Sequence, residues 1–250
     1  MILSPALFIE NCPSTNAILK QLIEDNTINI NELNNLFFLY TNYQNAGRGL
    51  ADNHWESEKD MNILASFYFN PPILPKNQFL FNQFFSLTIL NTISHFLPNA
   101  KIKWPNDIYI RNKKIAGILI EHSLTSTSIK YTIAGVGINV NQTKFSSSLP
   151  NPTSLCIETG KQHQLSRILN LIVQEGEKLL PYLYTEKKEP LNELYLAKLF
   201  NLDVWAEYAI FDKKITAKII GTDPFGRLLL VDKHNNSYTC NLKEIKFLLS

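Results

Sequence analysis

Two basic residues of this sequence stand beside small residues, in segments that could hold an anion. Arg48 lies between Gly47 and Gly49 in a long polar stretch, where its guanidinium would supply a forked, permanently charged donor. The flanking glycines would let backbone N–H groups face a phosphate or a carboxylate. Lys114 precedes Ala116-Gly117, which leave room for a ligand above a strand. A surface turn or a strand-end charge explains either segment taken alone, so neither one assigns a function.

The placement of glycine points to the same segments. The chain has 250 residues and only 9 glycines, which is few for this length. Gly135 and Gly137 lie in an apolar run that ends at Asn139, and glycine weakens a strand unless something approaches it closely. That run is equally well explained by a bulge packed on a helix or by a surface beneath a ligand. Neither a dinucleotide fingerprint nor a Walker phosphate loop is present.

Composition narrows the class of protein. Apolar residues make up 45% of the chain and the net charge is +2, which predicts a globular protein and argues against nucleic-acid binding through phosphate contacts. The three cysteines are too few and too widely spaced for a disulfide framework or a zinc site. No secretory signal or run of about 18 apolar residues is visible, so we expect a cytoplasmic protein that does not bind membranes.

Hydrophobic periodicity predicts an α/β protein with a change of pattern near residue 202. Helices are expected at residues 17–24, 78–96, 165–184 and 189–200. Strands are expected at residues 36–41, 62–69 and 129–140, with a hairpin of strands within 101–121. Short alternating strands follow at residues 204–210, 214–220, 228–231 and 237–242. The last group predicts a small separate β module.

Taken together, five segments resemble the biotin–protein ligases, also called biotin–[carboxyl-carrier-protein] ligases. They occur in the family's order: Ser14-Thr15-Asn16, Gln44 with Gly47-Arg48-Gly49 and Trp55, Lys103-Trp104-Pro105-Asn106-Asp107, Lys114-Ile115-Ala116-Gly117-Ile118-Leu119, and Gly135-Val136-Gly137-Ile138-Asn139. The resemblance implies a mixed β-sheet backed by helices, of the class II synthetase-like catalytic type, over residues 1–201. It also implies a small SH3-like β-barrel over residues 202–250. Because Ser14 already belongs to the ligase part, we expect the monofunctional type without an N-terminal DNA-binding domain.

The family joins biotin to ATP, giving biotinyl-5′-AMP and pyrophosphate, and then passes biotin to a lysine of a biotin carboxyl carrier domain. The resemblance therefore implies ATP and biotin as substrates, Mg²⁺ arriving with ATP, and the carrier of a biotin-dependent carboxylase as partner. It leaves a homodimer open. Two alternatives also stay open, namely a lipoate or octanoyl ligase of the same fold and a degenerate protein that binds biotin without turnover. The five histidines show no ligand spacing, so no metal is assigned to the protein alone.

The resemblance also implies roles for particular residues. Catalysis would fall to Lys114, Arg48 and Asp107, with Lys114 holding the carboxylate and α-phosphate oxygens and Asp107 orienting or deprotonating the acceptor amine. The residues implied for biotin are Ser14, Thr15, Asn16, Gln44, Arg48, Gly49, Leu50, Lys114 and Gly117. The residues implied for ATP and the adenylate are Arg48, Trp55, Lys103, Asn106 and Asn139, with Trp55 on the adenine.

The loop after Arg48 departs from the family's pattern. Leu50 stands where a polar residue is usual, and Asp52 and Asp60 stand where members commonly have glycine. We therefore expect a weaker hold on the adenylate, and with it a leakier intermediate or a slower first step.

Overall fold

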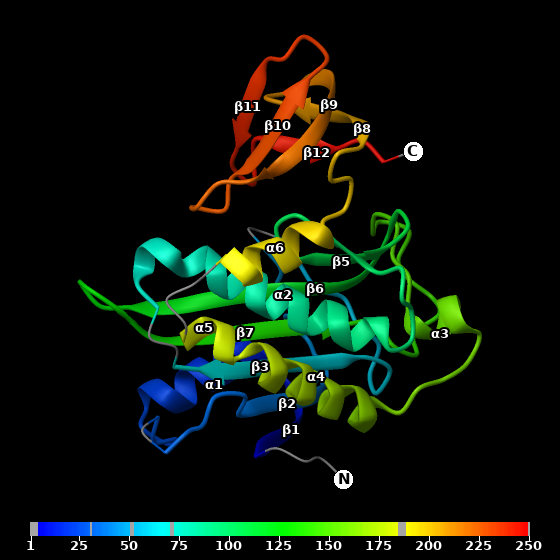
Figure 1. Cartoon of the computed structure of the whole chain (residues 1–250). Helices are drawn as coiled ribbons and strands as arrows, with labels where there is room; N and C mark the ends of the chain where they lie inside the picture. Colours follow the sequence, from blue (N-terminus) through cyan, green and yellow to red (C-terminus); the bar gives the residue numbers. More distant parts are fainter. Residues whose placement is uncertain (1–4, 31, 51–52, 71–72, 185–188, 250) are drawn as a thin grey trace.

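The computed structural model describes residues 5–30, 32–50, 53–70, 73–184 and 189–249 and shows two β-sheets of different size (Figure 1). The larger sheet has the strand order β1-β2-β3-β7-β6-β5-β4 and is mixed, because β1 runs parallel to β2 while the other neighbours are antiparallel. Its strands are β1 (Ala6–Cys12), β2 (Phe38–Gln44), β3 (Ile63–Phe69), β4 (Lys101–Lys103), β5 (Asp107–Ile110), β6 (Lys113–Leu124) and β7 (Ile129–Ile138). The expected α/β class with a mixed sheet is confirmed.

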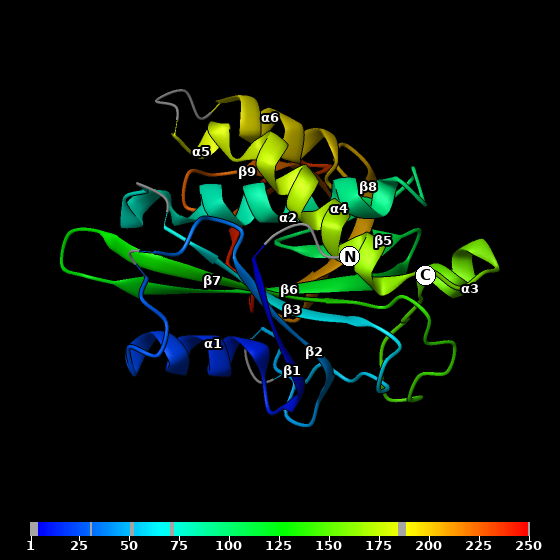
Figure 2. The same cartoon turned by 90° about the horizontal axis from the view of Figure 1, so that it is seen from below.

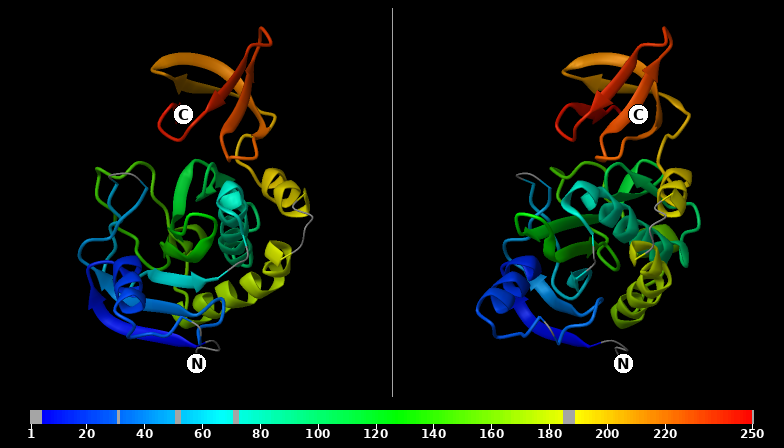
Figure 3. Two further views of the ribbon diagram at one scale, coloured as in Figure 1. Left: turned by 90° about the vertical axis from the view of Figure 1, so that its left-hand side faces the viewer. Right: turned by 60° about the vertical axis from the view of Figure 1, so that its left-hand side comes forward.

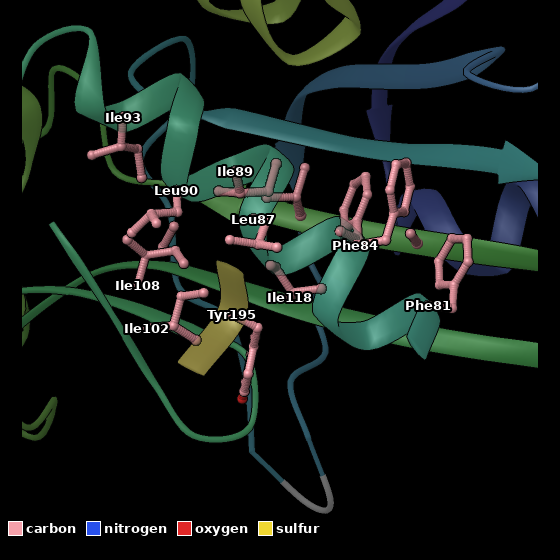
Figure 4. Close-up of a cluster of buried hydrophobic side chains, with 14 of the residues drawn as sticks. Phe81, Phe84, Leu87, Ile89, Leu90, Ile93, Ile102, Ile108, Ile118 and Tyr195 are labelled. Atoms are coloured by element: carbon pink, nitrogen blue, oxygen red, sulfur yellow. The ribbon is translucent and has the colours of Figure 1, made fainter. Parts of the chain in front are cut away.

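Helices cover both faces of this sheet, and α1 lies on the opposite side from α2 and α4 (Figure 2). The helical elements are α1 (Thr15–Glu24), η1 (Pro75–Asn77), α2 (Gln78–Ser94), α3 (Leu155–Thr159), α4 (Leu165–Leu179), α5 (Pro181–Tyr184) and α6 (Glu189–Ala197). Helix α2 is apolar on nearly all sides because it lies between the sheet and the other helices. Its large side chains pack on apolar residues of β4, β5 and β6 and on Tyr195 of α6 (Figure 4).

Two rungs of the sheet, meaning rows of residues paired across β3, β7 and β6, form part of the site. One rung aligns Ser66 of β3, Gly135 of β7 and Leu119 of β6, and the next but one aligns Leu64, Gly137 and Gly117. Because side chains two residues apart on a strand share a face, both rungs present the same face of the sheet. Tyr68 continues this face and packs in the core cluster that includes Leu19 and Ile23 of α1. The two glycine-bearing rungs therefore belong to the α1 side of the sheet.

The smaller sheet is antiparallel, with the order β11-β10-β9-β8-β12. Its strands are β8 (Trp205–Ile210), β9 (Lys213–Thr222), β10 (Leu228–Asp232), β11 (Ser237–Cys240) and β12 (Ile245–Phe247). Within the described residues no pairing joins β11 to β12, so these strands form a five-stranded sheet. The closed β-barrel stays a prediction. The smaller sheet lies outside the larger one (Figure 3), and the expected domain boundary near residue 202 stays a prediction.

A turn of the smaller sheet is fastened to the larger one. The indole Nε1 of Trp104 donates to the backbone oxygen of Gly226 at 2.8 Å, and the Phe79 ring lies directly beneath Gly226. Gly226 has a φ of +86°, a conformation that glycine adopts without strain. The hydroxyl of Tyr195 donates to the backbone oxygen of Pro105 at 2.8 Å. These contacts fix the turn between β4 and β5, which carries Asn106 and leads into Asp107 at the start of β5.

Several boundaries differ from the sequence-based expectations. Strands β1 and β12 and helix α3 were not expected, since β1 carries mixed polar and apolar residues and the other two are short. The helix expected over residues 165–184 is divided into α4 and α5 at Pro181, whose missing N–H interrupts the helical hydrogen bonds. Pro71 and Pro72, which follow the strand expected over residues 62–69, lie outside the described residues. No helix in the described part of the chain is long and apolar enough to cross a bilayer.

Candidate active site

A cavity of about 420 Å³ opens over the two glycine-bearing rungs, where the N-terminus of α1, the loop after β2 and the turn between β4 and β5 meet. Its volume is within the range of small-molecule sites. Of the predicted site residues, the cavity is lined by Ser14, Thr15, Asn16, Gln44, Arg48, Gly49, Leu50, Trp55, Lys103, Asn106, Asp107, Lys114 and Gly117. The smaller sheet contributes lining residues that were not predicted, namely Leu242, Lys243, Ile245, Lys246 and Phe247.

Asn139 is the exception among the predicted residues, because it does not line the cavity. It is 4% exposed, and its Nδ2 donates to the backbone oxygen of Thr153 at 3.0 Å. Its backbone joins the end of β7 to β6, where it donates to Ile115, and to the start of α3, where it accepts from Leu155. In this structure Asn139 therefore supports the wall behind the cavity, and a contact with the adenylate stays a prediction.

One end of the cavity is lined by neutral hydrogen-bonding groups. Thr15 donates to Oε1 of Gln44 from both its backbone nitrogen, at 2.7 Å, and its hydroxyl, at 3.0 Å. The Ser66 hydroxyl donates to Oδ1 of Asn16 at 2.5 Å and lies 2.7 Å from the Thr15 oxygen. Ser14 precedes α1 with extended backbone, but its side chain makes no capping hydrogen bond. The Ser14 and Thr15 hydroxyls are thus placed at the cavity and not used as a helix cap.

Next to this end lies a residue that the sequence reasoning missed and that does not itself line the cavity. Glu121 accepts from Nδ2 of Asn16 at 2.6 Å and pairs with Nη2 of Arg48 at 3.2 Å. It lies two and four residues beyond Leu119 and Gly117 on β6, so it shares their face of the sheet. A carboxylate at that spacing from a ligand-facing glycine was the signal that could have identified it.

The other end of the cavity is charged. Nζ of Lys114 lies 2.7 Å from Oδ1 of Asp107, and both side chains are largely buried, at 30% and 24% exposed. The Lys114 ammonium also lies 5.7 Å from the centroid of the Trp55 ring. A partly desolvated lysine attracts an anion more strongly than an exposed one. This end can therefore accept a carboxylate or a phosphate.

The loop between the two ends folds back on itself. Gly49 donates its N–H to the backbone oxygen of Asn53 at 2.7 Å, and Trp55 donates its N–H to that of Gly47 at 3.0 Å. The Trp55 indole lies over Gly117 and Gly137, where a Cβ atom at either glycine would collide with it. Gly117, expected beneath a ligand, is in this structure beneath the indole. The aromatic ring thus forms the floor of the cavity beside Lys114.

Asp52 and Asp60 stand where the family commonly has glycine, and the structure describes only Asp60. Asp52 lies outside the described residues. Asp60 has a φ of +62°, in the left-handed region that glycine tolerates best. Its N–H donates to the backbone oxygen of Asn42 at 3.1 Å, which holds the turn in that conformation. The observation agrees with the expectation that this position suits glycine, and asparagine and aspartate are the residues that tolerate it next best.

Lys103 lies in an aromatic cage at the edge of the cavity, with Nζ 5.0 Å from the centroid of the Tyr109 ring and 4.9 Å from that of Phe247. Burial lowers its pKa from the usual 10.5, although the charge of Asp107 acts in the opposite direction. In the window between the lowered pKa and 10.5, the unfolded chain holds a proton that the folded protein has released. The free energy of unfolding therefore rises with pH through that window.

We expect Lys103→Met to be more stable than the unmodified protein at neutral pH, because it removes the cost of burying the charge. The difference between the two proteins in the free energy of unfolding should shrink as the pH approaches 10.5, because Lys103 of the unfolded chain also loses its proton there. Urea unfolding at several pH values measures it, with Lys101→Met at the exposed start of the same strand as control. A difference that stays constant up to pH 10.5 would contradict the argument.

Metal-binding residues do not gather at this site. Within the described ranges, no three His, Cys, Asp or Glu side chains are close enough together to hold a metal ion. Asp107 is the carboxylate that lines the cavity, and it is already paired with Lys114.

Comparison with known proteins gives one consistent family. Residues 9–139, a little over half of the chain, match the biotin/lipoate A/B protein ligase family. The chain is 25% identical to the bifunctional ligase/repressor BirA of Escherichia coli over 194 residues, which cover 75% of this chain and 59% of that protein. It is also 25% identical to biotin–protein ligase 1 of Arabidopsis thaliana over 215 residues, covering 79% of this chain and 56% of that one. The chain thus spans less than two thirds of the length of these relatives.

Solved structures agree on the fold. A biotin protein ligase from Aquifex aeolicus in complex with biotin and ATP is similar with a TM-score of 0.79 at 23% identity, over 99% of this chain and 100% of that one. A Helicobacter pylori biotin acetyl coenzyme A carboxylase synthetase with bound biotinylated ATP is similar with a TM-score of 0.59 at 16% identity, over 95% and 100%. At these identities the likeness establishes the common fold, including the smaller sheet.

Proposed function

The chain belongs to the biotin/lipoate A/B protein ligase family, and from this premise we propose that it is an ATP-dependent biotin–protein ligase. It would activate biotin as biotinyl-5′-AMP with release of pyrophosphate, and then transfer the biotinyl group to a lysine of a carrier domain. The observation that carries the proposal is one cavity with two unlike ends. Amide and hydroxyl groups around Thr15 and Asn16 form one end, and the Lys114–Asp107 pair forms the other.

The polar end and the charged end of the cavity suit the ureido group and the carboxylate of biotin, respectively. The ureido group of biotin has N–H donors and a carbonyl acceptor, which match the hydroxyl and amide groups of Ser14, Thr15 and Gln44. The carboxylate at the other end of biotin would meet Lys114. The Arabidopsis thaliana relative is a biotin–protein ligase and the Aquifex aeolicus structure is a complex with biotin and ATP, which supports this ligand.

In the first step, an oxygen of the biotin carboxylate attacks the α-phosphorus of ATP, and the bond to pyrophosphate breaks. Two anions must approach each other, so a cation held between them lowers the barrier. Lys114 is in place for this role, because its Nζ is at the cavity and its present partner, Asp107, is an anion that a substrate carboxylate or phosphate can replace.

In the second step, the amine of the carrier lysine attacks the biotinyl carbonyl and AMP leaves. The amine must lose a proton, and a carboxylate within reach can accept it. Asp107 would be freed for this role once Lys114 has turned to the phosphate. The same pair would thus support both steps in sequence.

Magnesium fits this site only as part of the nucleotide. The described residues offer no set of carboxylates that would hold the ion by themselves. We therefore treat Mg²⁺ as a component of the MgATP substrate, and no step is assigned to a metal held by the protein. The carrier domain and a homodimer remain predictions of the family resemblance.

Pyrophosphate release tests the proposal and separates it from its alternatives. The full chain is incubated with MgATP and either biotin or lipoate, and pyrophosphate is measured by a coupled assay. We expect release with biotin and little with lipoate, whose dithiolane ring offers no N–H to the polar end. Release with lipoate alone would favour the lipoate ligase. Tight biotin binding by calorimetry without any adenylate formed would favour the degenerate binder.

A further inference from the structure

Glu121 is a carboxylate that the proposed mechanism does not use, although it touches two residues of the site. It lies in β6 and faces the α1 side of the sheet, four residues beyond Gly117. Oε2 accepts from Nδ2 of Asn16 at 2.6 Å, and both carboxylate oxygens lie 3.2 Å from Nη2 of Arg48. The Asn16 side chain is buried, whereas the Arg48 and Glu121 side chains are 47% and 36% exposed.

The carboxylate dictates how the Asn16 amide is turned. An ionised carboxylate only accepts hydrogen bonds, so the amide must direct Nδ2 and not Oδ1 toward Glu121. A second acceptor, the backbone oxygen of Leu119, lies 3.2 Å from the same Nδ2. Oδ1 of Asn16 is therefore directed to the Ser66 hydroxyl, which donates to it.

The orientation of the Asn16 amide affects the hydrogen bonds of Ser66 and Thr15. A hydroxyl has one proton, so Ser66 shares its proton between Oδ1 of Asn16 and the Thr15 oxygen, and Thr15 is an acceptor toward Ser66. The Thr15 proton goes to Oε1 of Gln44, which also accepts the backbone N–H of Thr15. Thr15 is thus left with one lone pair for a ligand, and a lone pair suits an N–H of a cyclic urea.

We propose that Glu121 is a positioning residue with two effects: it fixes the donor and acceptor pattern at the biotin end through Asn16, and it holds Arg48 away from Lys114 before the nucleotide binds. The inference rests on the proposed function. The second effect follows from the length of β6, because the four residue steps from Gly117 to Glu121 span about 13 Å. Arg48 can reach an anion at Lys114 only after it leaves Glu121.

Two substitutions separate the effects. Glu121→Gln keeps an oxygen that accepts from Asn16 but removes the charge that holds Arg48. Glu121→Ala removes both. We expect biotin to bind Glu121→Gln within about threefold of the unmodified protein and to bind Glu121→Ala on the order of tenfold more weakly, the usual loss for a hydrogen bond to a charged group.

The charge effect is measured with a non-hydrolysable sulfamoyl analogue of biotinyl-5′-AMP. Both variants free Arg48, so the ratio of analogue affinity to biotin affinity should rise about two- to fivefold at low salt, as expected for a partly exposed ion pair. The rise should disappear at high salt, which screens such a pair. In an Arg48→Ala background, Glu121→Gln should leave the ratio unchanged.

The measurement is calorimetric titration of the full chain with biotin and with the analogue. Glu207→Gln, which removes a similarly exposed carboxylate paired with Lys214 at 2.9 Å on the smaller sheet, should change neither affinity. Thermal unfolding of each variant controls for folding, and Glu121→Gln alone tests the charge effect if Glu121→Ala does not fold.

Equal biotin affinities of Glu121→Gln and Glu121→Ala would overturn the first effect, and an unchanged affinity ratio in Glu121→Gln would overturn the second. A merely structural role would weaken biotin and analogue alike and would not produce the split. If the unmodified chain bound neither ligand, the proposed function would fail together with this role of Glu121. If it bound both and the variants did not differ, only the role of Glu121 would fail.

Discussion

Lys114→Ala is expected to lower biotin-dependent pyrophosphate release by a factor on the order of 10²–10³, which is the usual effect of removing one preorganised charge from a transition state. Lys114 is the cation closest to the carboxylate Asp107, at 2.7 Å, and it is partly shielded from water by Trp55. Without it, the two anions of the first step repel each other and Asp107 adds a third negative charge. Initial rates at saturating biotin and MgATP measure the loss.

The control for this prediction is the neighbouring lysine. Lys113 is exposed at the start of the same strand and does not line the cavity, so Lys113→Ala should retain the full rate. Lys114→Arg should recover part of the rate, because it restores the charge with a different shape. Equal rates for Lys114→Ala and the unmodified protein would remove Lys114 from the mechanism.

Gly137→Ala is expected to disturb the floor of the cavity. The added Cβ would collide with the six-membered and five-membered rings of Trp55, and the indole cannot retreat without moving the loop. Forcing an extra methyl group into a packed site typically lowers the free energy of unfolding by about 1–3 kcal/mol. Displacement of Trp55 should also slow pyrophosphate release, because the ring lies beside Lys114.

As a control, Gly137→Ala is also made in a Trp55→Ala background. There the Cβ at position 137 meets no indole, so Gly137→Ala should cost little further stability in urea unfolding. The interaction energy of the double-mutant cycle isolates the contact. A cost that is the same in both backgrounds would mean that the methyl group clashes with something other than Trp55.

The sequence predicted which segments meet around the cavity, but it did not predict which of their side chains contact each other. The segments around Thr15, Arg48, Asp107 and Lys114 were brought together by a family resemblance, and the structure does place them around one cavity. Which of them touch could not be read from the chain. The Arg48–Glu121 pair joins residues 73 positions apart and depends on how a loop folds over the sheet.

Local patterns explain the other successes and failures. Apolar runs located α2 and the strands β3 and β7, which are largely buried. Strand β1 was missed because an edge strand buries only part of its surface and so carries a mixed pattern. Asn139 does not line the cavity, and its Nδ2 donates to the backbone of Thr153, so its predicted contact with the adenylate stays a prediction.

The contribution of the smaller sheet to the cavity was also not predictable from the chain. Residues 242–247 reach the cavity because the turn at Gly226 is held by Trp104 and Phe79, a contact between segments that are far apart in sequence. Alternating hydrophobicity predicted the strands β8 to β11 of this module but neither β12 nor the docking of the module. Phe247 thereby forms one side of the cage around Lys103.

The most direct test of the account is the transfer of biotin to a carrier. The full chain is incubated with MgATP, biotin and a purified biotin carboxyl carrier domain, and the carrier is analysed by intact-mass spectrometry. We expect the mass of the carrier to increase by one biotinyl group on a single lysine, only when ATP and biotin are both present, and to stay unchanged with Lys114→Ala over the same time. A carrier whose mass does not change with the unmodified chain would contradict the proposed function.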